Sequence, residues 1–600
     1  MPQDQDSASV QEVRAKVEKA YAAFGKYRLY DQQRVDSIVE AMGAAGRENS
    51  KRLAEMAVEE TGYGNVPDKI VKNLLNSDLL PRYIRGMKTV GVLRELPEKK
   101  IVEIAEPLGV VAALVPTTNP TSTVFFKTII ALKAGNAVVI SPHPRAAKCT
   151  KAAADLMAQA ALQAGAPEGI IQCIAAPTME STHALMKHER IAVILATGGH
   201  AMVKAAYSSG KPAFGVGPGN VPAYIERSAP VAEAVAKVVE GKAFDYGTVC
   251  SSEQALVCEE SIREAVVAEL KRRKAFFCDD AQKQALTKAL LKDNFRINPD
   301  CVALSPVRLA RAAGFEIPAD TSILVVELQG VGKDYPLSVE KLSPVLALYF
   351  VRDHAAALDT CEALLRFGGL GHTCVIHSQD DARIREFGLR MPAMRVLVNT
   401  GAPGGSTGMT TNLQPSMTLG CGAMAGNVTG DNVGPQHLIN IKRLAWMVRT
   451  AEEAMPMLAA PPPVSEPAKL DRQTIAAAIE RYLAQRGIAV APAPAPAAPS
   501  AAAQVVDRFL ASRRTGCAGP LPNCPPSCPC VQAKQTPPAA PPPPAPPPAP
   551  QVAIVDFVCE ADVRAALQQS RKIYIGPRTI VTPSARDLGR QHDILVVAQR

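Results

Sequence analysis

The feature that most constrains the fold is an alternation of short apolar runs with stretches of helical periodicity, which continues to about residue 450. Short runs with few charged residues are typical of strands that are buried on both faces of a parallel sheet. Four such runs are residues 109–115, 137–140, 191–195 and 322–326. The pattern predicts an α/β fold in which helices cover both faces of parallel sheets.

The composition changes abruptly after Ala459. Three proline-rich stretches, 460–467, 489–499 and 537–550, cannot bury a core and are expected to be extended linkers. The 600 residues are enough for three or four domains, and the proline-rich part separates the last of them from the rest.

Two short helices are predicted between the linkers, at residues 470–487 and 501–514. Each has an apolar stripe: Ile475, Ile479, Tyr482 and Leu483 on the first, and Val505, Val506, Phe509 and Leu510 on the second. An isolated helix of this length is marginally stable in water, so the stripes predict a partner surface. The alternative is that the helices fold back on the enzyme's own surface.

The last segment, residues 552–600, is expected to fold again as a small module of strands and helices. Thr582 followed by proline is a typical start for one of its helices. We interpret this module as a protein-interaction unit.

Four cysteines precede this module in a proline-rich loop: Cys517, Cys524, Cys528 and Cys530. Their number would suit zinc or an iron–sulfur cluster, but the spacing is not that of a standard finger, so a metal site stays open.

One cysteine stands out in the first 450 residues. Cys250 lies in Phe-Asp-Tyr-Gly-Thr-Val-Cys-Ser-Ser-Glu-Gln, residues 244–254, a turn of small residues that precedes an apolar run. An ordinary thiol has a pKa of about 8.5, so a nucleophilic thiol needs a site that stabilises the thiolate, such as backbone N–H groups in a tight turn. Cys250 is the candidate nucleophile, and the alternative is a buried structural cysteine.

Further motifs accompany the cysteine segment in a fixed order. They are residues 115–123 (VPTTNPTST), 140–145 (ISPHPR), 195–200 (LATGGH), 340–344 (EKLSP) and 418–422 (TLGCG), the last followed by 432–440 (NVGPQHLIN). Together they resemble the aldehyde dehydrogenase superfamily over about residues 10–450. The resemblance is strongest to its CoA-acylating branch: the acetaldehyde and propionaldehyde dehydrogenases of bacterial microcompartments, and the aldehyde-oxidising half of bifunctional aldehyde-alcohol dehydrogenases.

The resemblance implies a domain plan for the chain. It places a Rossmann-like cofactor domain mainly in residues 1–240, with strands near 93–103 that pair subunits. A catalytic domain follows in 241–430, and 431–459 returns to the strand extension of a homo-oligomer, a dimer or a tetramer. Linkers with two helices and the cysteine cluster then occupy 460–551.

The resemblance also assigns catalytic roles. A thiolate at Cys250 would add to an aldehyde carbonyl, and the amide of Asn119 and the backbone N–H of Cys250 would stabilise the oxyanion. Hydride transfer would leave a thioester on the cysteine. His372 could deprotonate the CoA thiol that takes the acyl group, and a loop histidine satisfied by hydrogen bonds is the alternative.

Val216 indicates whether the acyl group is transferred to a thiol or hydrolysed by water. Hydrolytic members of the superfamily carry a glutamate that activates water in a motif similar to Glu-Leu-Gly-Gly-Lys, and Val216 stands at that place. Without a positioned base, water attacks a thioester poorly, whereas a thiol ionises readily. The sequence therefore favours CoA as acyl acceptor.

The dinucleotide site is implied by the resemblance, because no G-x-G-x-x-G fingerprint follows a predicted strand. Thr197, Gly198 and Gly199 are expected near the pyrophosphate and nicotinamide, and Glu340 near the nicotinamide ribose. The other candidate cofactor-binding residues are Ser141, Pro142, Gly217 and Gly219. The lysine and glutamate that usually hold the adenosine ribose are absent, which leaves NAD versus NADP open. The resemblance to acylating members favours NAD.

Charge and composition limit the partners. The net charge is +9, but no long basic run occurs and aromatic residues make up 4%, which argues against nucleic-acid binding. No apolar stretch is long enough to span a bilayer and the start does not resemble a signal peptide, so no membrane partner is expected. Unpaired cysteine spacing fits reduced thiols in the cytoplasm.

The sequence thus predicts a CoA-acylating aldehyde dehydrogenase that converts a short aldehyde, NAD⁺ and CoA into acyl-CoA and NADH. The apolar helices resemble encapsulation peptides, which implies microcompartment shell proteins as partners and a place inside a bacterial microcompartment. Two alternatives are a hydrolytic aldehyde dehydrogenase and a non-catalytic assembly protein. A bifunctional enzyme is disfavoured, because the chain after residue 450 is short and rich in proline. Aldehyde length stays open between acetaldehyde and propionaldehyde.

Overall fold

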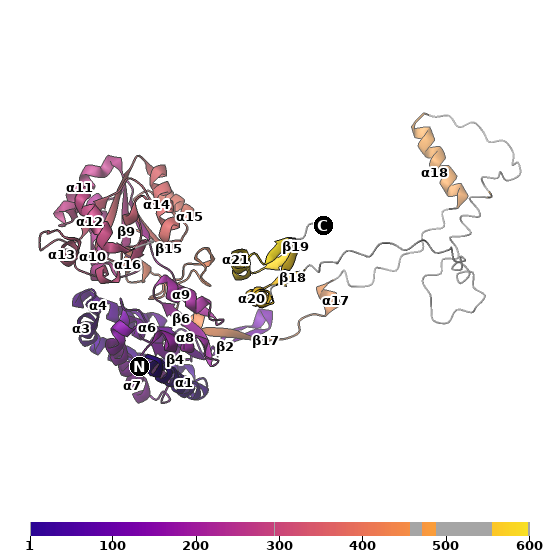
Figure 1. Cartoon of the computed structure of the whole chain (residues 1–600). Coiled ribbons are helices and arrows are strands. Elements are labelled where there is room, and N and C mark those ends of the chain that lie inside the picture. Colours follow the sequence, from indigo (N-terminus) through magenta and orange to yellow (C-terminus); the bar gives the residue numbers. More distant parts are fainter. Residues whose placement is uncertain are drawn as a thin grey trace. The chain divides into compact units, whose positions relative to one another are not determined.

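A computed structural model describes residues 2–292, 295–455, 471–487, 504, 555–569 and 571–597. The chain forms two compact units, Met1–Pro462 and Pro463–Arg600. The α/β class expected from the sequence is confirmed in the first unit (Figure 1). The predicted helix at 501–514, apart from residue 504, and the four clustered cysteines lie outside the described residues.

The first sheet is parallel and has five strands in the order β5-β4-β3-β6-β7. The strands are β3 (Val110–Leu114), β4 (Ala137–Ser141), β5 (Ile171–Cys173), β6 (Ile191–Thr197) and β7 (Ala213–Val216). β3 and β4 are buried along their whole length, as expected for a sheet covered on both faces.

Nine helices of the first part of the chain surround this sheet or precede it. They are α1 (Pro2–Tyr27), α2 (Gln32–Glu48), α3 (Ser50–Thr61), α4 (Val66–Leu74), α5 (Leu80–Ile84), α6 (Pro120–Lys133), α7 (Ala147–Gln163), α8 (Met179–Lys187) and α9 (His200–Tyr207). A π-helical segment, Leu75–Leu79, joins α4 to α5. One hydrophobic core includes Val13 of α1, Val35 of α2 and Phe125 of α6 together with the strands.

The second sheet is also parallel and has seven strands in the order β10-β13-β14-β9-β8-β15-β16. They are β8 (Val221–Ile225), β9 (Glu253–Glu259), β10 (Phe276–Phe277), β13 (Leu324–Glu327), β14 (Val345–Val351), β15 (Gly371–His377) and β16 (Ala393–Val398). Successive residues of β9 alternate between two cores, with Val257 in one and Leu256 in the other. Helices therefore cover both faces of this sheet as well.

The helices of the second sheet are α10 (Val231–Ala243), α11 (Arg263–Arg272), α12 (Asp280–Leu290), α13 (Pro306–Ala313), α14 (His354–Gly368), α15 (Asp381–Arg390) and α16 (Ala402–Ser406). A short hairpin of β11 (Leu291–Lys292) and β12 (Arg296–Ile297) follows α12. The chain passes from the first sheet to the second between Val216 and Val221, earlier than the expected boundary at 240. The reason is that β8 and α10 belong to the second sheet and its core.

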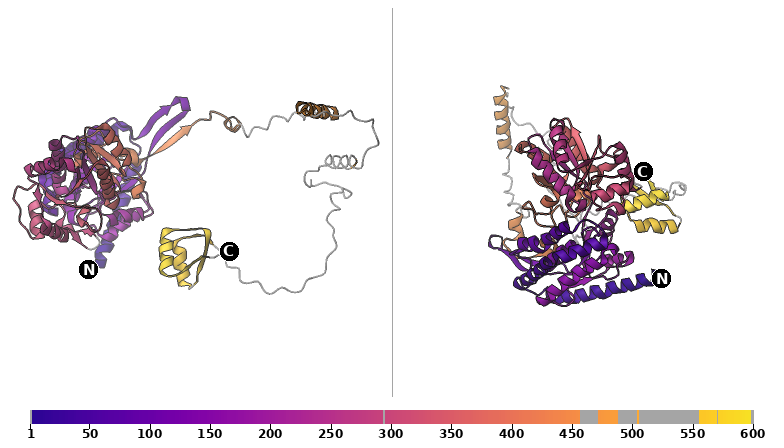
Figure 2. Two further views of the ribbon diagram at one scale, coloured as in Figure 1. Left: turned by 90° about the horizontal axis from the view of Figure 1, so that it is seen from above. Right: turned by 90° about the vertical axis from the view of Figure 1, so that its left-hand side faces the viewer.

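The strand extension is an antiparallel sheet of β1 (Gly91–Leu96), β2 (Ile101–Pro107) and β17 (Ile439–Ala445), with β2 in the centre. The three strands project from the body of the first unit, as Figures 1 and 2 show. α17 (Ala451–Ala454) follows β17. Strands near 93–103 and after 437 therefore come together as the sequence analysis expected.

The second unit contains α18 (Arg472–Gln485) and a small parallel sheet of β18 (Val555–Val558), β19 (Ile573–Val581) and β20 (Leu595–Val597). α20 (Glu560–Gln568) and α21 (Pro583–Gln591) connect these strands and share a core with them. Thr582 caps α21, its hydroxyl accepting a hydrogen bond from the Ala585 amide. The last strand, β20, was not predicted.

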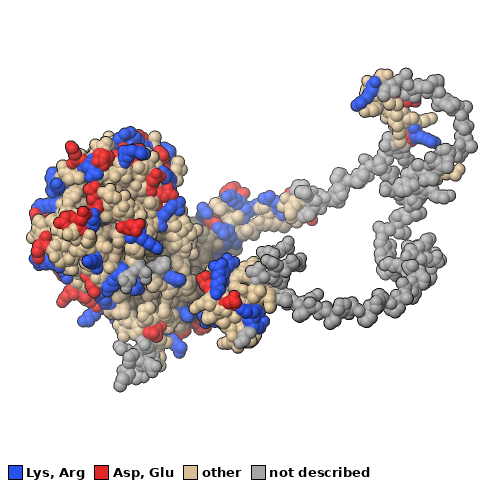
Figure 3. All heavy atoms as spheres, turned by 45° about the horizontal axis from the view of Figure 1, so that its top comes forward, with Lys and Arg blue, Asp and Glu red and all other residues tan. Residues whose placement is uncertain are grey.

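In the view of Figure 3, basic and acidic side chains are interspersed over the large unit. In the described part of the chain, no helix is long and apolar enough to cross a membrane.

Candidate active site

The turn that carries Cys250 has an unusual backbone. It follows a 3₁₀ helix, Phe244–Gly247, in which Asp245 and Tyr246 have φ values of 45° and 54°. Non-glycine residues rarely adopt this left-handed conformation, and where they do it often marks a functional site. Gly247, with φ of 74°, lies so close to Ser343 that a Cβ would come within 2.6 Å of the Ser343 carbonyl oxygen. Packing thus fixes the turn just before β9.

Cys250 is partly exposed and lies next to a glycine-containing loop. Gly219, in the loop between β7 and β8, approaches it so closely that a Cβ would be 1.9 Å from the Cys250 carbonyl oxygen and 3.3 Å from Cδ2 of His372. Burial, followed by the charge of Glu340, raises the pKa of the Cys250 thiol to about 12. The sequence analysis expected a stabilised thiolate, and in the free site the pKa shift has the opposite direction.

His372 lies at the start of β15 and is fully buried. Its Nδ1 is 3.0 Å from Oγ1 of Thr373, while its Nε2 has no hydrogen-bond partner among the described residues. Burial, assisted by the charge of Arg395, holds the pKa of His372 well below its usual range. The imidazole is therefore neutral, and one of its nitrogens has no partner among the described residues.

Asn119 is the N-cap residue of α6, but its side chain does not cap the helix. Its Oδ1 accepts a hydrogen bond of 2.7 Å from Nζ of Lys72, and its Nδ2 donates to Oγ1 of Thr118 at 3.1 Å. The same Lys72 nitrogen donates to Oγ1 of Thr248 at 2.8 Å. Since Thr248 is two residues before Cys250, the structure brings Asn119 and the cysteine turn to one place.

The carboxyl ends of the first sheet are the place where a dinucleotide is expected. The chain moves from β3 to β4 and β5 on one side and then returns to β6 on the other side of β3. Ligands of open α/β sheets bind at such a point, where the strand order reverses. Thr197 ends β6, and Gly198 and Gly199 lead into α9 without a side-chain cap. Oγ1 of Thr197 is buried without a partner among the described residues, which suits a ligand group at the N-terminus of α9.

The remaining predicted cofactor residues lie at two places. Ser141 ends β4, and its hydroxyl is 3.1 Å from that of Thr182, with Pro142 directly after it. Gly217 and Gly219 lie in the loop that joins the two sheets. The Gly219 amide donates to Oε1 of Glu340 at 3.1 Å. Burial raises the pKa of Glu340 to about 7, although this hydrogen bond and Lys242 and Lys341 oppose the rise.

Val216 is the last residue of β7 and is buried. Its side chain offers neither a proton acceptor nor a donor. Val216, which the sequence analysis aligned with the glutamate of hydrolytic members, is thus an apolar group at the end of β7.

Two residues next to the site were not found by the sequence analysis. Lys72 and Asp245 form a buried ion pair of 2.5 Å, although 173 positions separate them. Asp245 lies inside the cysteine motif, but nothing in the sequence around Lys72 marks it. Among the described residues, no group of three or more metal-ligating side chains occurs.

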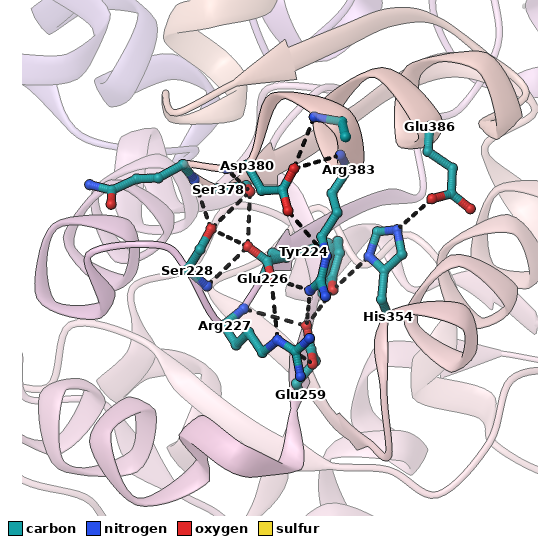
Figure 4. A network of polar contacts seen from close by, with 12 residues as sticks. Tyr224, Glu226, Arg227, Ser228, Glu259, His354, Ser378, Asp380, Arg383 and Glu386 are labelled. Carbon is teal, nitrogen blue, oxygen red and sulfur yellow. Dashed lines mark hydrogen bonds and ion pairs between the residues drawn. The ribbon is translucent and has the colours of Figure 1, made fainter.

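A second polar network lies at the carboxyl ends of β8, β9 and β15 in the seven-stranded sheet (Figure 4). Arg383 of α15 forms ion pairs with Glu226, which follows β8, and with Glu259, which ends β9. Burial opposes ionisation of Glu226, but hydrogen bonds from Ser228 and Ser378 and the charge of Arg383 lower its pKa. Cys250 precedes β9, so this network lies apart from the candidate active site and attaches α15 to the sheet.

Residues 3–284 match the sequence model described as "Aldehyde dehydrogenase family". The acetylating aldehyde dehydrogenase of Geobacillus thermoglucosidasius is 52% identical, with a TM-score of 0.73, and the match covers 74% of this chain and 98% of that one. The chain belongs to the acetylating aldehyde dehydrogenase family.

The bifunctional aldehyde-alcohol dehydrogenase AdhE of Escherichia coli is 43% identical over 442 residues, which are 73% of this chain and 50% of that protein. The chain thus spans about half the length of this relative.

Two more distant structures are propionaldehyde dehydrogenases. One, from Rhodopseudomonas palustris with bound propionyl-CoA, is 28% identical with a TM-score of 0.66 and matches 72% of this chain and 94% of that one. The other, from the fucose utilisation microcompartment of Clostridium phytofermentans, is 26% identical with a TM-score of 0.65 and matches 72% and 97%.

Proposed function

We propose that this protein is a CoA-acylating aldehyde dehydrogenase, which converts an aldehyde, NAD⁺ and CoA into acyl-CoA, NADH and a proton. The observation that carries the proposal is the turn of Cys250 beside Gly219 and His372. It is combined with the apolar Val216, at the position where the resemblance implies a water-activating carboxylate in hydrolytic members. A thioester formed there has a thiol as its effective acceptor.

In the proposed reaction, the sulfur of Cys250 bonds to the carbonyl carbon of the aldehyde after losing its proton. The resulting oxyanion accepts hydrogen bonds from Nδ2 of Asn119 and from the Cys250 amide, each commonly contributing about 3 kcal/mol to transition-state stabilisation. NAD⁺ would be held at the carboxyl ends of β3 and β6 and, when bound, would supply the hydride acceptor. The residues that would hold it are Thr197, Gly198 and Gly199, because the orphaned Thr197 hydroxyl and the uncapped start of α9 fit its phosphates.

His372 is proposed to accept the proton of the CoA thiol. In this role Nδ1 carries the ring hydrogen and donates it to Oγ1 of Thr373, which leaves the unpartnered Nε2 as a lone pair. The CoA sulfur then bonds to the acyl carbon, and the bond from that carbon to the Cys250 sulfur breaks. Burial keeps the imidazole neutral, so its lone pair is free to accept a proton at neutral pH, and the lowered pKa makes it a weaker base than an exposed histidine.

The experiment that tests the proposal compares turnover with and without CoA. Without CoA, the purified enzyme should produce at most one equivalent of NADH per active site and then nearly stop, because water clears the acyl-enzyme slowly. Adding CoA should restore steady turnover and yield acyl-CoA. Sustained NADH formation with carboxylate as product would favour the hydrolytic alternative, and no NADH above background would favour a non-catalytic assembly protein.

We further propose a short aliphatic substrate, propionaldehyde or acetaldehyde, and NAD rather than NADP. The support for the aldehyde is that two similar structures are propionaldehyde dehydrogenases and that the more similar one is an acetylating aldehyde dehydrogenase. A steady-state comparison of kcat/KM for C2 to C4 aldehydes, with each dinucleotide in turn, decides both points.

A homo-oligomer is proposed from the strand extension. β1 and β17 are its two edge strands, and β17 exposes the apolar side chains of Ile441 and Leu444. Exposed strand edges with apolar side chains favour pairing with another chain. Analytical ultracentrifugation of the purified protein would distinguish a dimer, a tetramer and a monomer.

A place inside a cytoplasmic microcompartment is proposed from α18. Its apolar side chains Ile475, Ile479 and Tyr482 are 45%, 53% and 56% exposed. Burying such a stripe against a shell protein would contribute several kcal/mol before ordering costs, roughly 1.5–3 kcal/mol for each side chain. The microcompartment origin of one similar structure supports the same proposal.

A further inference from the structure

A buried ammonium group lies directly behind the proposed oxyanion donor. Lys72 of α4 is 3% exposed, and its Nζ donates to three oxygens: Oδ1 of Asn119 at 2.7 Å, Oγ1 of Thr248 at 2.8 Å and Oδ2 of Asp245 at 2.5 Å. An ammonium group has three hydrogens, so these three acceptors use its whole capacity. One side chain therefore connects the start of α6 with the turn that carries Cys250.

Asp245 holds this ammonium in place. It is fully buried, and its Oδ1 accepts from the Asn65 amide at 2.8 Å, while Oδ2 also accepts from Lys69 at 3.0 Å. Its left-handed backbone brings the carboxylate so close to Gly64 that a Cβ there would be 1.8 Å from Oδ1. The structure thus accommodates an unfavourable backbone conformation and a close glycine contact at the position of this carboxylate.

The contact with Lys72 fixes the orientation of the Asn119 amide. The two ends of an amide have nearly the same shape, but an ammonium group can only donate, so only Oδ1 can face it. Nδ2 must then point to the other side. One of its two hydrogens goes to Oγ1 of Thr118, and the second has no acceptor among the described residues. That hydrogen is the one that an oxyanion on the substrate would accept.

We propose that Lys72 is a positioning residue: it orients the Asn119 amide with its N–H toward the oxyanion and links it to the turn of Cys250. This inference rests on the proposed role of Asn119 in the reaction. Lys72 does not touch the reacting atoms, and it acts through the asparagine. Without it, the amide could turn over and present its oxygen to the oxyanion, which would repel it.

A double-mutant cycle tests this coupling. Asn119→Ala should lower kcat/KM for the aldehyde by about 10²–10³-fold, the usual loss for one oxyanion donor. Lys72→Met should lower it by roughly tenfold or more in the wild type, but have little further effect in the Asn119→Ala protein, because the group it positions is then absent. Losses that multiply in the double variant would overturn the proposal, as would full activity of Lys72→Met.

Lys69→Met is the matched control. Lys69 lies on the same helix, is equally buried and also bonds Asp245, but it contacts the carbonyl of Thr118 and not the Asn119 side chain. Its substitution should lower the melting temperature about as much as Lys72→Met does, and its effect on kcat/KM should multiply with that of Asn119→Ala. Non-additivity of the same size in this control would mean that any damage to the network acts alike, which would overturn the specific role of Lys72.

The activity of Lys72→Gln is a second test, which remains valid even if Lys72→Met folds poorly. A glutamine amide can still donate to Oδ1 of Asn119, so this variant should recover at least several-fold activity over Lys72→Met at similar stability. Equal activity of the two variants would overturn the orienting role. If Asn119→Ala alone left kcat/KM unchanged, the proposed function of Asn119 would have failed instead, so the two failures are distinguishable.

Discussion

The close approach of Gly219 to Cys250 gives a sharp test of the site geometry. In Gly219→Ala, the new methyl group would lie 1.9 Å from the Cys250 carbonyl oxygen and 3.3 Å from Cδ2 of His372. Ordinary carbon–oxygen contacts are about 3.3–3.6 Å, so the cysteine turn or the loop must retreat by roughly 1.5 Å. The backbone of Gly219 does not have a positive φ, so alanine itself is permitted there. The perturbation is therefore purely steric.

The expected loss of activity follows from this displacement. A misplacement of about 1 Å in a reacting group can cost about a hundredfold in rate, and we expect kcat of Gly219→Ala to fall by at least that factor. Overpacking should cost about 1–3 kcal/mol of unfolding free energy. Hence the loss of activity should exceed any loss that unfolding explains at 25 °C.

The assay is kcat at saturating aldehyde, NAD⁺ and CoA, with the melting temperature measured in parallel. Gly388→Ala is the matched control, because Gly388 is exposed on α15 and a Cβ there meets no atom within 4 Å. This control should keep wild-type kcat and gain up to about 1 kcal/mol in stability from the better helix former. If Gly219→Ala stayed within tenfold of the wild-type kcat, the contact between the loop and the cysteine turn would be refuted.

Two further predictions concern the thiol and the tail. Burial and Glu340 raise the pKa of Cys250 to about 12, so the thiolate fraction in the free enzyme should increase tenfold for each pH unit and the rate of alkylation by iodoacetamide should keep rising from pH 7 to 9. Glu340→Gln removes a negative charge, which should lower the thiol pKa and speed alkylation at pH 8. A plateau in the wild-type rate near pH 8 would contradict the raised pKa. A fluorescent protein fused to α18 should enter microcompartment shells in cells that make such shells. Ile479→Glu with Leu483→Glu should leave the fusion protein diffuse, because the two charges disrupt the apolar stripe. If the unmutated fusion protein stays diffuse beside intact shells, α18 alone does not direct a protein into them.

Local pattern predicted the elements well, because buried parallel strands have a strong signature of their own. The runs at 109–115, 137–140 and 191–195 became β3, β4 and β6 with small changes at their ends. The expected strand at 322–326 begins two residues later, at Leu324. The helix stripe at 470–487 likewise became α18.

Sequence did not indicate which sheet a strand joins. β8 continues the same alternation as β7, so nothing local marks the passage to the second sheet after Val216. Pairing is decided by packing between segments far apart in the chain, and for that reason the expected boundary at 240 came too late.

The sequence also did not predict the direction of the pKa shift at Cys250. A tight turn near a glycine suggested a stabilised thiolate at Cys250, but the pKa depends on burial and on Glu340, which is far away in the sequence. The contact between Lys72 and Asn119 similarly requires α4 and the start of α6 to meet in space. Motifs identify the groups that react, whereas the groups that position and tune them come from tertiary contacts.

The central claim is that the acyl group is bound to Cys250 as a thioester until it is transferred to CoA. The most direct measurement is mass spectrometry of the enzyme after brief incubation with propionaldehyde and NAD⁺ and without CoA. The peptide that contains Cys250 should gain the mass of one propionyl group, and adding CoA should remove that mass and release propionyl-CoA in equal amount. An unmodified Cys250 peptide while one equivalent of NADH forms, or an adduct that CoA does not discharge, would contradict the account.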